Sequence, residues 1–190
     1  MALTTLDPRT ALVLIDLQQG IVGMPTLPYP AAEVVERGVE LAEAFRSHDL
    51  PVILVRVSFG AGDRVPGRTE AGAGGLAPQA GWDEIVPQLA GLGAATVTKR
   101  NWGAFYGTDL DLQLRRRGVT QIVLGGIATS IGVESTARAA HEHGYHVTLV
   151  TDAMADRSEE SHAHSVQQIF PRLGELGTTA EVVELLAKTR

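Results

Sequence analysis

Cysteine is absent from the 190 residues of this chain. A chain without thiols forms no disulfide, no thiolate zinc site and no iron–sulfur cluster, and it has no thiolate nucleophile. This composition also fits a reducing compartment, and we expect a cytoplasmic location. The stretch from Met1 to Pro8 shows no basic region followed by an apolar run, so we expect no signal peptide.

Basic charge and aromatic side chains are also scarce. The chain has 22 acidic residues against 16 lysines and arginines, a formal net charge of −6, and only 5% aromatic residues. It lacks a basic stripe with interleaved aromatic residues, which disfavours nucleic-acid binding. Its apolar runs are far shorter than the roughly 20 residues that a membrane helix needs. We therefore expect neither nucleic acid nor membrane as a partner.

Several short apolar runs bounded by turn residues are typical of buried parallel strands. Hydrophobic residues make up 44% of the chain, enough for a substantial core. Without repeats, linkers or a low-complexity tail, residues 1–190 are expected to form a single domain. The expected strands are residues 10–16, 51–57, 94–99, 121–124, 146–152 and a short sixth strand at 174–178.

Segments with helical periodicity separate these strands. A strand, a helix and a strand without a hairpin signal make a βαβ unit. The alternation predicts an α/β fold: a three-layer, doubly wound, mostly parallel six-stranded sheet with helices on both faces, similar to the Rossmann fold. Residues 20–30 are expected to form a loop. Helices are expected at residues 31–46, 82–89, 108–117, 158–170 and 180–188, with another that follows the fourth strand and is capped by Thr129 or Ser130.

The segment from residue 58 to 81 is rich in glycine and is too long for an ordinary connection. Its glycines are not followed by the Gly-Lys-Ser/Thr of a phosphate-binding loop. Two interpretations stay open. The segment is either a mobile cover without side-chain chemistry, or a loop in which Arg64 or Arg68 pairs with a substrate carboxylate.

Three polar features lie where expected strands end. Asp16 and Lys99 each end a strand, and the stretch from Gly125 to Ala140 leads from a strand into an Ala-rich helix. Ligands of α/β sheets bind beyond the carboxyl ends of strands, and a helix that starts there directs backbone N–H groups toward them. From these residues alone, Asp16 is interpreted equally well as a helix cap or loop residue and as a functional acid. A lysine at the end of a strand is more often solvated than catalytic.

The chain resembles the isochorismatase-like (cysteine hydrolase) superfamily in these segments. The similar segments are Leu14-Ile15-Asp16-Leu17-Gln18, Thr98-Lys99-Arg100-Asn101-Trp102-Gly103-Ala104-Phe105, and Gly125 to Arg138 with the sequence GGIATSIGVESTAR. Most members of that superfamily have a catalytic Cys where this chain has Gly132. The true isochorismatases resemble this chain because they too can carry Gly there, and they hydrolyse a vinyl ether without a covalent intermediate.

The resemblance implies a hydrolase that needs no cofactor, acts on a small, carboxylated, isochorismate-like substrate, and assembles as a homodimer or homotetramer. It implies that Asp16 protonates the substrate, that Lys99 orients Asp16 and binds a carboxylate, and that Gly132 leaves room for the substrate. It also implies a cis peptide between Ile127 and Ala128, whose backbone forms an oxyanion site with Gly132. The expected substrate contacts are Gln18, Arg64, Arg68, Trp102, Phe105, Tyr106, Ser130 and Ile131.

Two other functions stay open from the sequence. One is an amide or imidate hydrolase of the same superfamily, in which Asp16 acts as a base on water. The other is a catalytically silent member that binds a metabolite. The ammonium of Lys99 favours ionised Asp16, whereas an apolar wall of Trp102, Phe105 and Tyr106 favours the neutral acid. No metal is expected, because the paired histidines are two residues apart and diverge on a helix.

Overall fold

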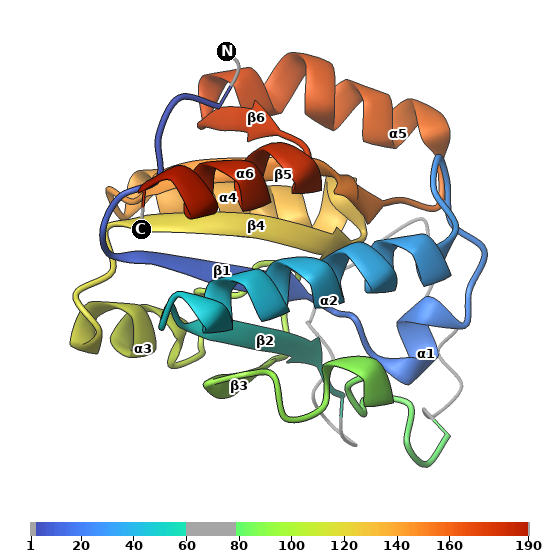
Figure 1. Cartoon of the computed structure of the whole chain (residues 1–190). Coiled ribbons are helices and arrows are strands. Elements are labelled where there is room, and N and C mark those ends of the chain that lie inside the picture. The colour runs from blue at the N-terminus through green and yellow to red at the C-terminus, as the bar shows by residue number, and fades with distance from the viewer. Residues whose placement is uncertain (1–2, 60–78, 190) are drawn as a thin grey trace.

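The computed structural model of the chain describes residues 3–59 and 79–189 (Figure 1). Its strands form one sheet in the order β3-β2-β1-β4-β5-β6, and every neighbouring pair is parallel. The order reverses between β1 and β4, and in such sheets the ligand crevice opens at the carboxyl ends of the strands that flank the reversal. The predicted six-stranded α/β fold is confirmed. The strands are β1 (Thr10–Ile15), β2 (Val52–Val57), β3 (Ala95–Lys99), β4 (Gln121–Ile127), β5 (His146–Ala155) and β6 (Glu175–Gly177).

Helices cover both faces of the sheet (Figure 1). Helices α2 (Ala31–Ser47) and α6 (Thr179–Thr189) pack on one face, and α3 (Leu110–Arg116) and α4 (Glu134–Glu142) pack on the other. Side chains alternate between the faces of a strand. Leu12 and Leu14 of β1 accordingly join the core under α2, while Val13 joins the core under α3 and α4. Within the described ranges, no helix has the length and apolar character to cross a lipid bilayer.

The segment predicted as a helix at residues 82–89 is not helical, apart from the short 3-10 turn η1 (Pro87–Leu89). It pairs instead with the chain that leaves β1. The N–H of Gln19 donates to the carbonyl of Glu84 at 2.8 Å, and the N–H of Val86 donates to the carbonyl of Leu17 at 3.1 Å. This pairing satisfies backbone groups that a helix would otherwise use, so tertiary contact overrides local periodicity.

The short helix α1 (Gln19–Val22) forms at the start of the stretch predicted as a loop. The segment predicted at 158–170 is helical, but it changes geometry along its length. It runs through α5 (Glu159–His164), the π-helical turn η3 (Ser165–Ile169) and the 3-10 turn η4 (Phe170–Arg172).

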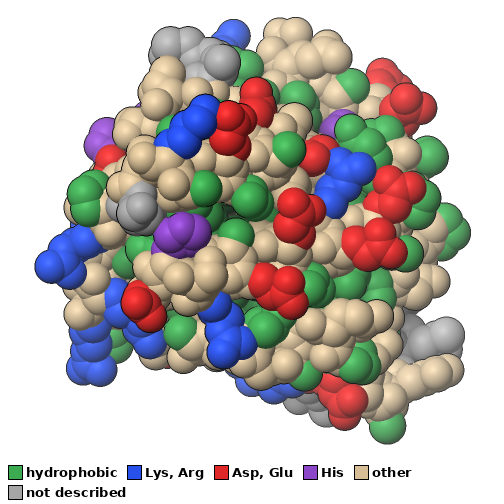
Figure 2. All heavy atoms as spheres, in the orientation of Figure 1, with side chains coloured by type: hydrophobic (Ala, Val, Ile, Leu, Met, Phe, Trp, Pro, Cys, Tyr) green, Lys and Arg blue, Asp and Glu red, His purple; other side chains and the backbone are tan. Residues whose placement is uncertain are grey.

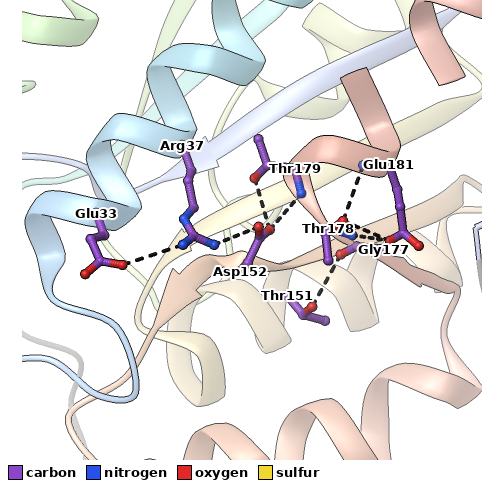
Figure 3. Close-up of polar contacts among 8 residues, drawn as sticks. All are labelled: Glu33, Arg37, Thr151, Asp152, Gly177, Thr178, Thr179 and Glu181. Carbon is purple, nitrogen blue, oxygen red and sulfur yellow. Dashed lines mark hydrogen bonds and ion pairs between the residues drawn. The ribbon is translucent and has the colours of Figure 1, made fainter. Parts of the chain in front are cut away.

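A polar network fixes α6 against α2 and β5 (Figure 3). The carboxylate of Asp152 in β5 accepts hydrogen bonds from the backbone N–H of Thr179, at 2.8 Å, and from its hydroxyl, at 3.0 Å. The same carboxylate pairs with Arg37 of α2 at 2.7 Å, and Arg37 also pairs with Glu33 at 3.5 Å. A carboxylate at the first turn of α6 complements the helix dipole. Asp152 therefore has a packing role in this layer.

The outer surface of α2 and α6 carries much of the acidic excess of the chain. Figure 2 shows carboxylates spread over this face among hydrophobic side chains. Two of them are paired along their own helix, Glu33 with Arg37 and Glu184 with Lys188. Such pairs on a solvated surface contribute little to stability.

Candidate active site

Two glycines bring β4 into close contact with its neighbours. Gly126 has φ of 121°, and a Cβ built there would lie 2.1 Å from the carbonyl oxygen of Ile15. A Cβ at Gly125 would lie 2.9 Å from the carbonyl oxygen of Ala153. Only glycine fits such a close backbone approach. The end of β4 is therefore held directly beside the end of β1, which Asp16 follows.

Asp16 lies at the carboxyl end of β1 in a backbone conformation that non-glycine residues seldom adopt. Its φ is 52°, and its N–H donates to the carbonyl of Val55 in β2 at 2.8 Å. The left-handed conformation costs a non-glycine residue roughly 1–3 kcal/mol and recurs at functional sites. The residue is only 5% exposed. The strand exit thus holds a buried carboxyl group in a fixed direction.

Lys99 reaches Asp16 from the other side of β2. It is the last residue of β3 and pairs in register with Val57, so β2 lies between it and β1. Its long side chain spans that strand and places Nζ 2.7 Å from Oδ2 of Asp16 and 3.2 Å from the carbonyl oxygen of Asn101. Lys99 is only 2% exposed. The structure therefore joins these two predicted residues in a buried ion pair.

Burial has the largest influence on the pKa of Asp16. Desolvation raises the pKa of Asp16 to about 6, while the charge and the hydrogen bond of Lys99 lower it by less. Oδ2 bonds to Lys99, whereas Oδ1 is buried and has no hydrogen-bond partner among the described residues. A buried polar atom without a partner is costly, and such atoms mark sites of proton transfer or ligand contact. Among the described residues, Oδ1 therefore keeps its hydrogen-bonding capacity for a proton or a ligand.

The turn after β4 brings Gly132 against this carboxyl group. A cis peptide joins Ile127 and Ala128, as the resemblance implies, and the π-helical turn η2 (Thr129–Val133) follows. A Cβ on Gly132 would lie 3.3 Å from Oδ2 of Asp16 and 2.9 Å from Cγ2 of Ile15. The space that glycine leaves is therefore narrow, and a side chain at this position has to displace Ile15 or Asp16.

The predicted capping of this turn by Thr129 or Ser130 is wrong. Ala128 precedes η2, and no side chain caps it. Instead, the N–H of Ser130 donates to Oδ2 of Asp156 at 2.6 Å, and the hydroxyl of Thr129 bonds to Nδ1 of His162 at 2.9 Å. Sequence reasoning gave Asp156 no role and considered His162 only as a metal ligand. Asp156 lies four residues beyond the strand expected at 146–152, and it directly follows β5 because that strand extends to Ala155.

The three aromatic side chains predicted to form an apolar wall beside Asp16 differ in burial. Phe105 is buried in the core under α3 and α4 and stacks on His143 with ring centroids 5.0 Å apart. Trp102 and Tyr106 are 68% and 81% exposed. The backbone of Trp102 approaches the site, because its carbonyl oxygen lies 3.6 Å from the Cβ position of Gly132.

The remaining predicted substrate contacts have different surroundings. Gln18 is fully buried, and its side-chain amide bonds twice to the backbone of Val57. Nε2 of Gln18 donates to the carbonyl of Val57 at 2.9 Å, and Oε1 accepts from the N–H of Val57 at 2.7 Å. It thereby connects the chain after β1 to β2. Ile131 lies in η2, one residue before Gly132, and is partly exposed. Arg64 and Arg68 lie outside the described residues.

Comparison with known proteins finds similarity along nearly the whole chain. The Isochorismatase domain family matches residues 10–181. The chain is 48% identical over 180 residues to the isochorismatase family protein YwoC of Bacillus subtilis, covering 93% of each chain. It is 44% identical over 180 residues to the isochorismatase family protein YecD of Escherichia coli O157:H7, covering 93% of this chain and 96% of YecD.

A solved structure gives the same result in three dimensions. An isochorismatase family protein from Burkholderia thailandensis superposes with a TM-score of 0.92 at 46% identity, covering 96% of this chain and 98% of that one. The matched range includes Asp16, Lys99 and Gly132. The similarity therefore extends over every part of the candidate site.

Proposed function

The chain belongs to the isochorismatase family, and we propose that it hydrolyses the vinyl ether of a small, carboxylated, isochorismate-like substrate with Asp16 as the acid. The observation that carries this proposal is the Asp16 carboxyl group itself. It is buried, its pKa is raised to about 6, and Oδ1 has no partner among the described residues. A carboxyl group in this state holds a proton at a higher pH than an exposed aspartate and can deliver it to a substrate.

The reaction needs one proton and one water molecule. Asp16 gives its proton to the terminal carbon of the enol ether, so its O–H bond breaks, a C–H bond forms, and the ether carbon becomes an oxocarbenium ion. Water adds to that carbon and returns a proton to the Asp16 carboxylate. The resulting hemiketal then divides into an alcohol and a ketone. Protonation of carbon is slow in water, and a positioned acid contributes about 10²–10⁴-fold to its rate.

Lys99 and the turn at Gly132 complete the proposed site. The ammonium of Lys99 has three N–H donors, and among the described residues two of them contact Asp16 and Asn101; the proposal assigns the third to a substrate carboxylate. The absence of cysteine supports a reaction without a covalent enzyme intermediate. We further propose that the backbone of Ile127, Ala128 and Gly132 faces the polar end of the substrate. The proposed vinyl-ether reaction is further supported by a 25% identity over 185 residues to a probable isochorismatase of Pseudomonas chlororaphis, covering 96% of this chain and 89% of that one.

A second candidate function is amide hydrolysis by activated water. With a pKa of about 6, Asp16 is mostly ionised at neutral pH, which suits a base that accepts a proton from water. Over 101 residues, half of this chain, the sequence is 35% identical to the ureidoacrylate amidohydrolase RutB of Stutzerimonas stutzeri. In this reaction the N–H groups of Ala128 and Gly132 stabilise the oxyanion.

Product analysis separates these functions. Purified protein is incubated with isochorismate and, separately, with ureidoacrylate, and pyruvate and ammonia are measured. We expect pyruvate from isochorismate. Ammonia without pyruvate supports the second function. If neither product forms while a thermal shift reveals ligand binding, the chain is a silent metabolite-binding member and both hydrolase proposals fail.

The dependence of kcat/KM on pH tests the role of Asp16 in whichever reaction is found. If Asp16 is the acid, kcat/KM falls as pH rises above about 6, because the proton is lost. If Asp16 is the base, kcat/KM falls as pH drops below about 6, because the carboxylate is protonated. The direction of the change therefore assigns the role without knowledge of the natural substrate.

A further inference from the structure

Asp156 is a second buried carboxylate near the turn, and the proposed chemistry does not use it. It directly follows β5 and is 3% exposed. Its Oδ2 accepts from the N–H of Ser130 at 2.6 Å, and its Oδ1 accepts from the N–H of Arg157 at 2.7 Å. Hydrogen bonds to an ionised, buried acceptor are short and roughly twice as strong as neutral ones. Both oxygens of Asp156 are therefore committed to the backbone.

The bond to Ser130 fixes the part of the turn that approaches Asp16. Ser130 lies two residues before Gly132, whose Cβ position is 3.3 Å from Oδ2 of Asp16. Within the turn, the carbonyl of Ala128 accepts from the N–H groups of Ile131 at 3.2 Å and of Val133 at 3.1 Å. These internal bonds give the turn its shape, whereas the bond to Asp156 ties it to the sheet.

Further contacts hold the turn and Asp156 in place. The hydroxyl of Thr129, which is fully buried, bonds to Nδ1 of the buried His162 in α5 at 2.9 Å. On the other side, the backbone of Asp156 exchanges two hydrogen bonds of 2.7 Å with Leu27. Asp156 therefore connects the end of β5 both to the chain at Leu27 and to the turn after β4.

We propose that Asp156 is a positioning residue, whose carboxylate holds residues 128–132 through the N–H of Ser130 so that the backbone at Gly132 meets the substrate beside Asp16. This inference rests on the proposed function, in which that backbone faces the substrate. His162 supports the same turn through Thr129. The N–H of Ser130 is then a structural donor, and the predicted contact of Ser130 with substrate is left to its side chain.

Asp152 provides a matched control. It is another carboxylate of β5 that accepts a backbone N–H, but its partners are Thr179 of α6 and Arg37 of α2 (Figure 3). Asp156→Ala, Asp156→Asn and Asp152→Ala are compared with the wild type. Kinetics are measured on the substrate that the product assay identifies, and hydrogen exchange of the Ser130 amide is measured by NMR.

We expect Asp156→Ala to lower kcat by about 10²-fold with a smaller change in KM, because a displaced turn misplaces groups that act in the transition state. We expect Asp156→Asn to retain more of kcat, because an amide oxygen still accepts from Ser130. Exchange at Ser130 is expected to accelerate in Asp156→Ala alone. Asp152→Ala is expected to lower the midpoint of thermal unfolding and to leave kcat near the wild-type value.

Unchanged kcat or unchanged Ser130 protection in folded Asp156→Ala overturns the inference, as does an equal loss of kcat in Asp152→Ala. If Asp156→Ala does not fold, Asp156→Asn decides in its place, and wild-type kcat together with wild-type protection overturns the inference. If the wild type hydrolyses none of the substrates, the proposed function fails, and exchange at Ser130 alone then decides whether Asp156 holds the turn.

Discussion

Asp16→Asn is expected to reduce turnover by about 10²–10⁴-fold while the protein stays folded. An amide has nearly the same shape as the carboxyl group, and its oxygen still accepts from Lys99, which donates to Asp16 at 2.7 Å in the wild type. The amide has no acidic proton to deliver to carbon and no carboxylate to activate water. Turnover is therefore lost whether Asp16 serves as acid or as base.

Asp49→Asn is the matched control for this variant. Asp49 is the other described non-glycine residue with positive φ, at 56°, and it is exposed. Both substitutions thus place asparagine in a left-handed conformation that it tolerates well. We expect Asp49→Asn to keep wild-type turnover in the steady-state assay and both variants to show wild-type far-UV circular dichroism. Wild-type rates in Asp16→Asn would refute the catalytic role of Asp16.

Lys99→Met is expected to destabilise the fold by about 3–5 kcal/mol near pH 8, because it leaves an ionised Asp16 buried without its partner. The loss is expected to be smaller near pH 5. Lys99 lowers the pKa of Asp16 through its charge and its hydrogen bond, so its removal raises that pKa above the present value of about 6. Near pH 5 the carboxyl group of the variant is then neutral and costs less to bury.

The sign of this pH dependence follows from linkage. The pKa of Asp16 in the folded chain is about 6 and lies above the ordinary aspartate value of 3.8. A group whose pKa is raised by folding adds to the free energy of unfolding when it is protonated. This contribution is complete at pH values below the pKa of the unfolded chain, and it is lost as pH rises through the pKa of the folded chain. Urea unfolding at both pH values measures it, with the exposed Lys188→Met as control. A Lys99→Met variant that becomes more stable as pH rises would contradict the assigned electrostatics.

The strands and their exits could be predicted because the signals are local. Continuous apolar runs identify central parallel strands, and Asp16 and Lys99 follow such runs directly. Parallel strands place their carboxyl ends at one edge, so the two residues were expected to meet there from adjacent strands. The expected adjacency is wrong, because β2 lies between β1 and β3. Their contact across β2 depends on strand order, which the sequence does not specify. The lysine side chain is long enough to span the intervening strand.

The rest of the site depends on contacts between distant parts of the chain. Asp156 and Ser130 are separated by 26 residues, and Thr129 and His162 by 33, so no local pattern indicated these bonds. The same holds for the extended pairing of residues 82–86 with the chain after β1. Phe105 was expected in an apolar wall beside Asp16, and its packing in the core under α3 and α4 depends on contacts that its neighbours in sequence do not indicate.

A titration of the Asp16 carboxyl carbon by ¹³C NMR tests the buried acid most directly. Asp16→Asn identifies the resonance by its absence, and the measurement needs no substrate. Because desolvation outweighs the influence of Lys99, we expect an apparent pKa near 6. A midpoint at or below 3.8, the ordinary value for an aspartate, would contradict the assignment of Asp16 as a buried proton donor.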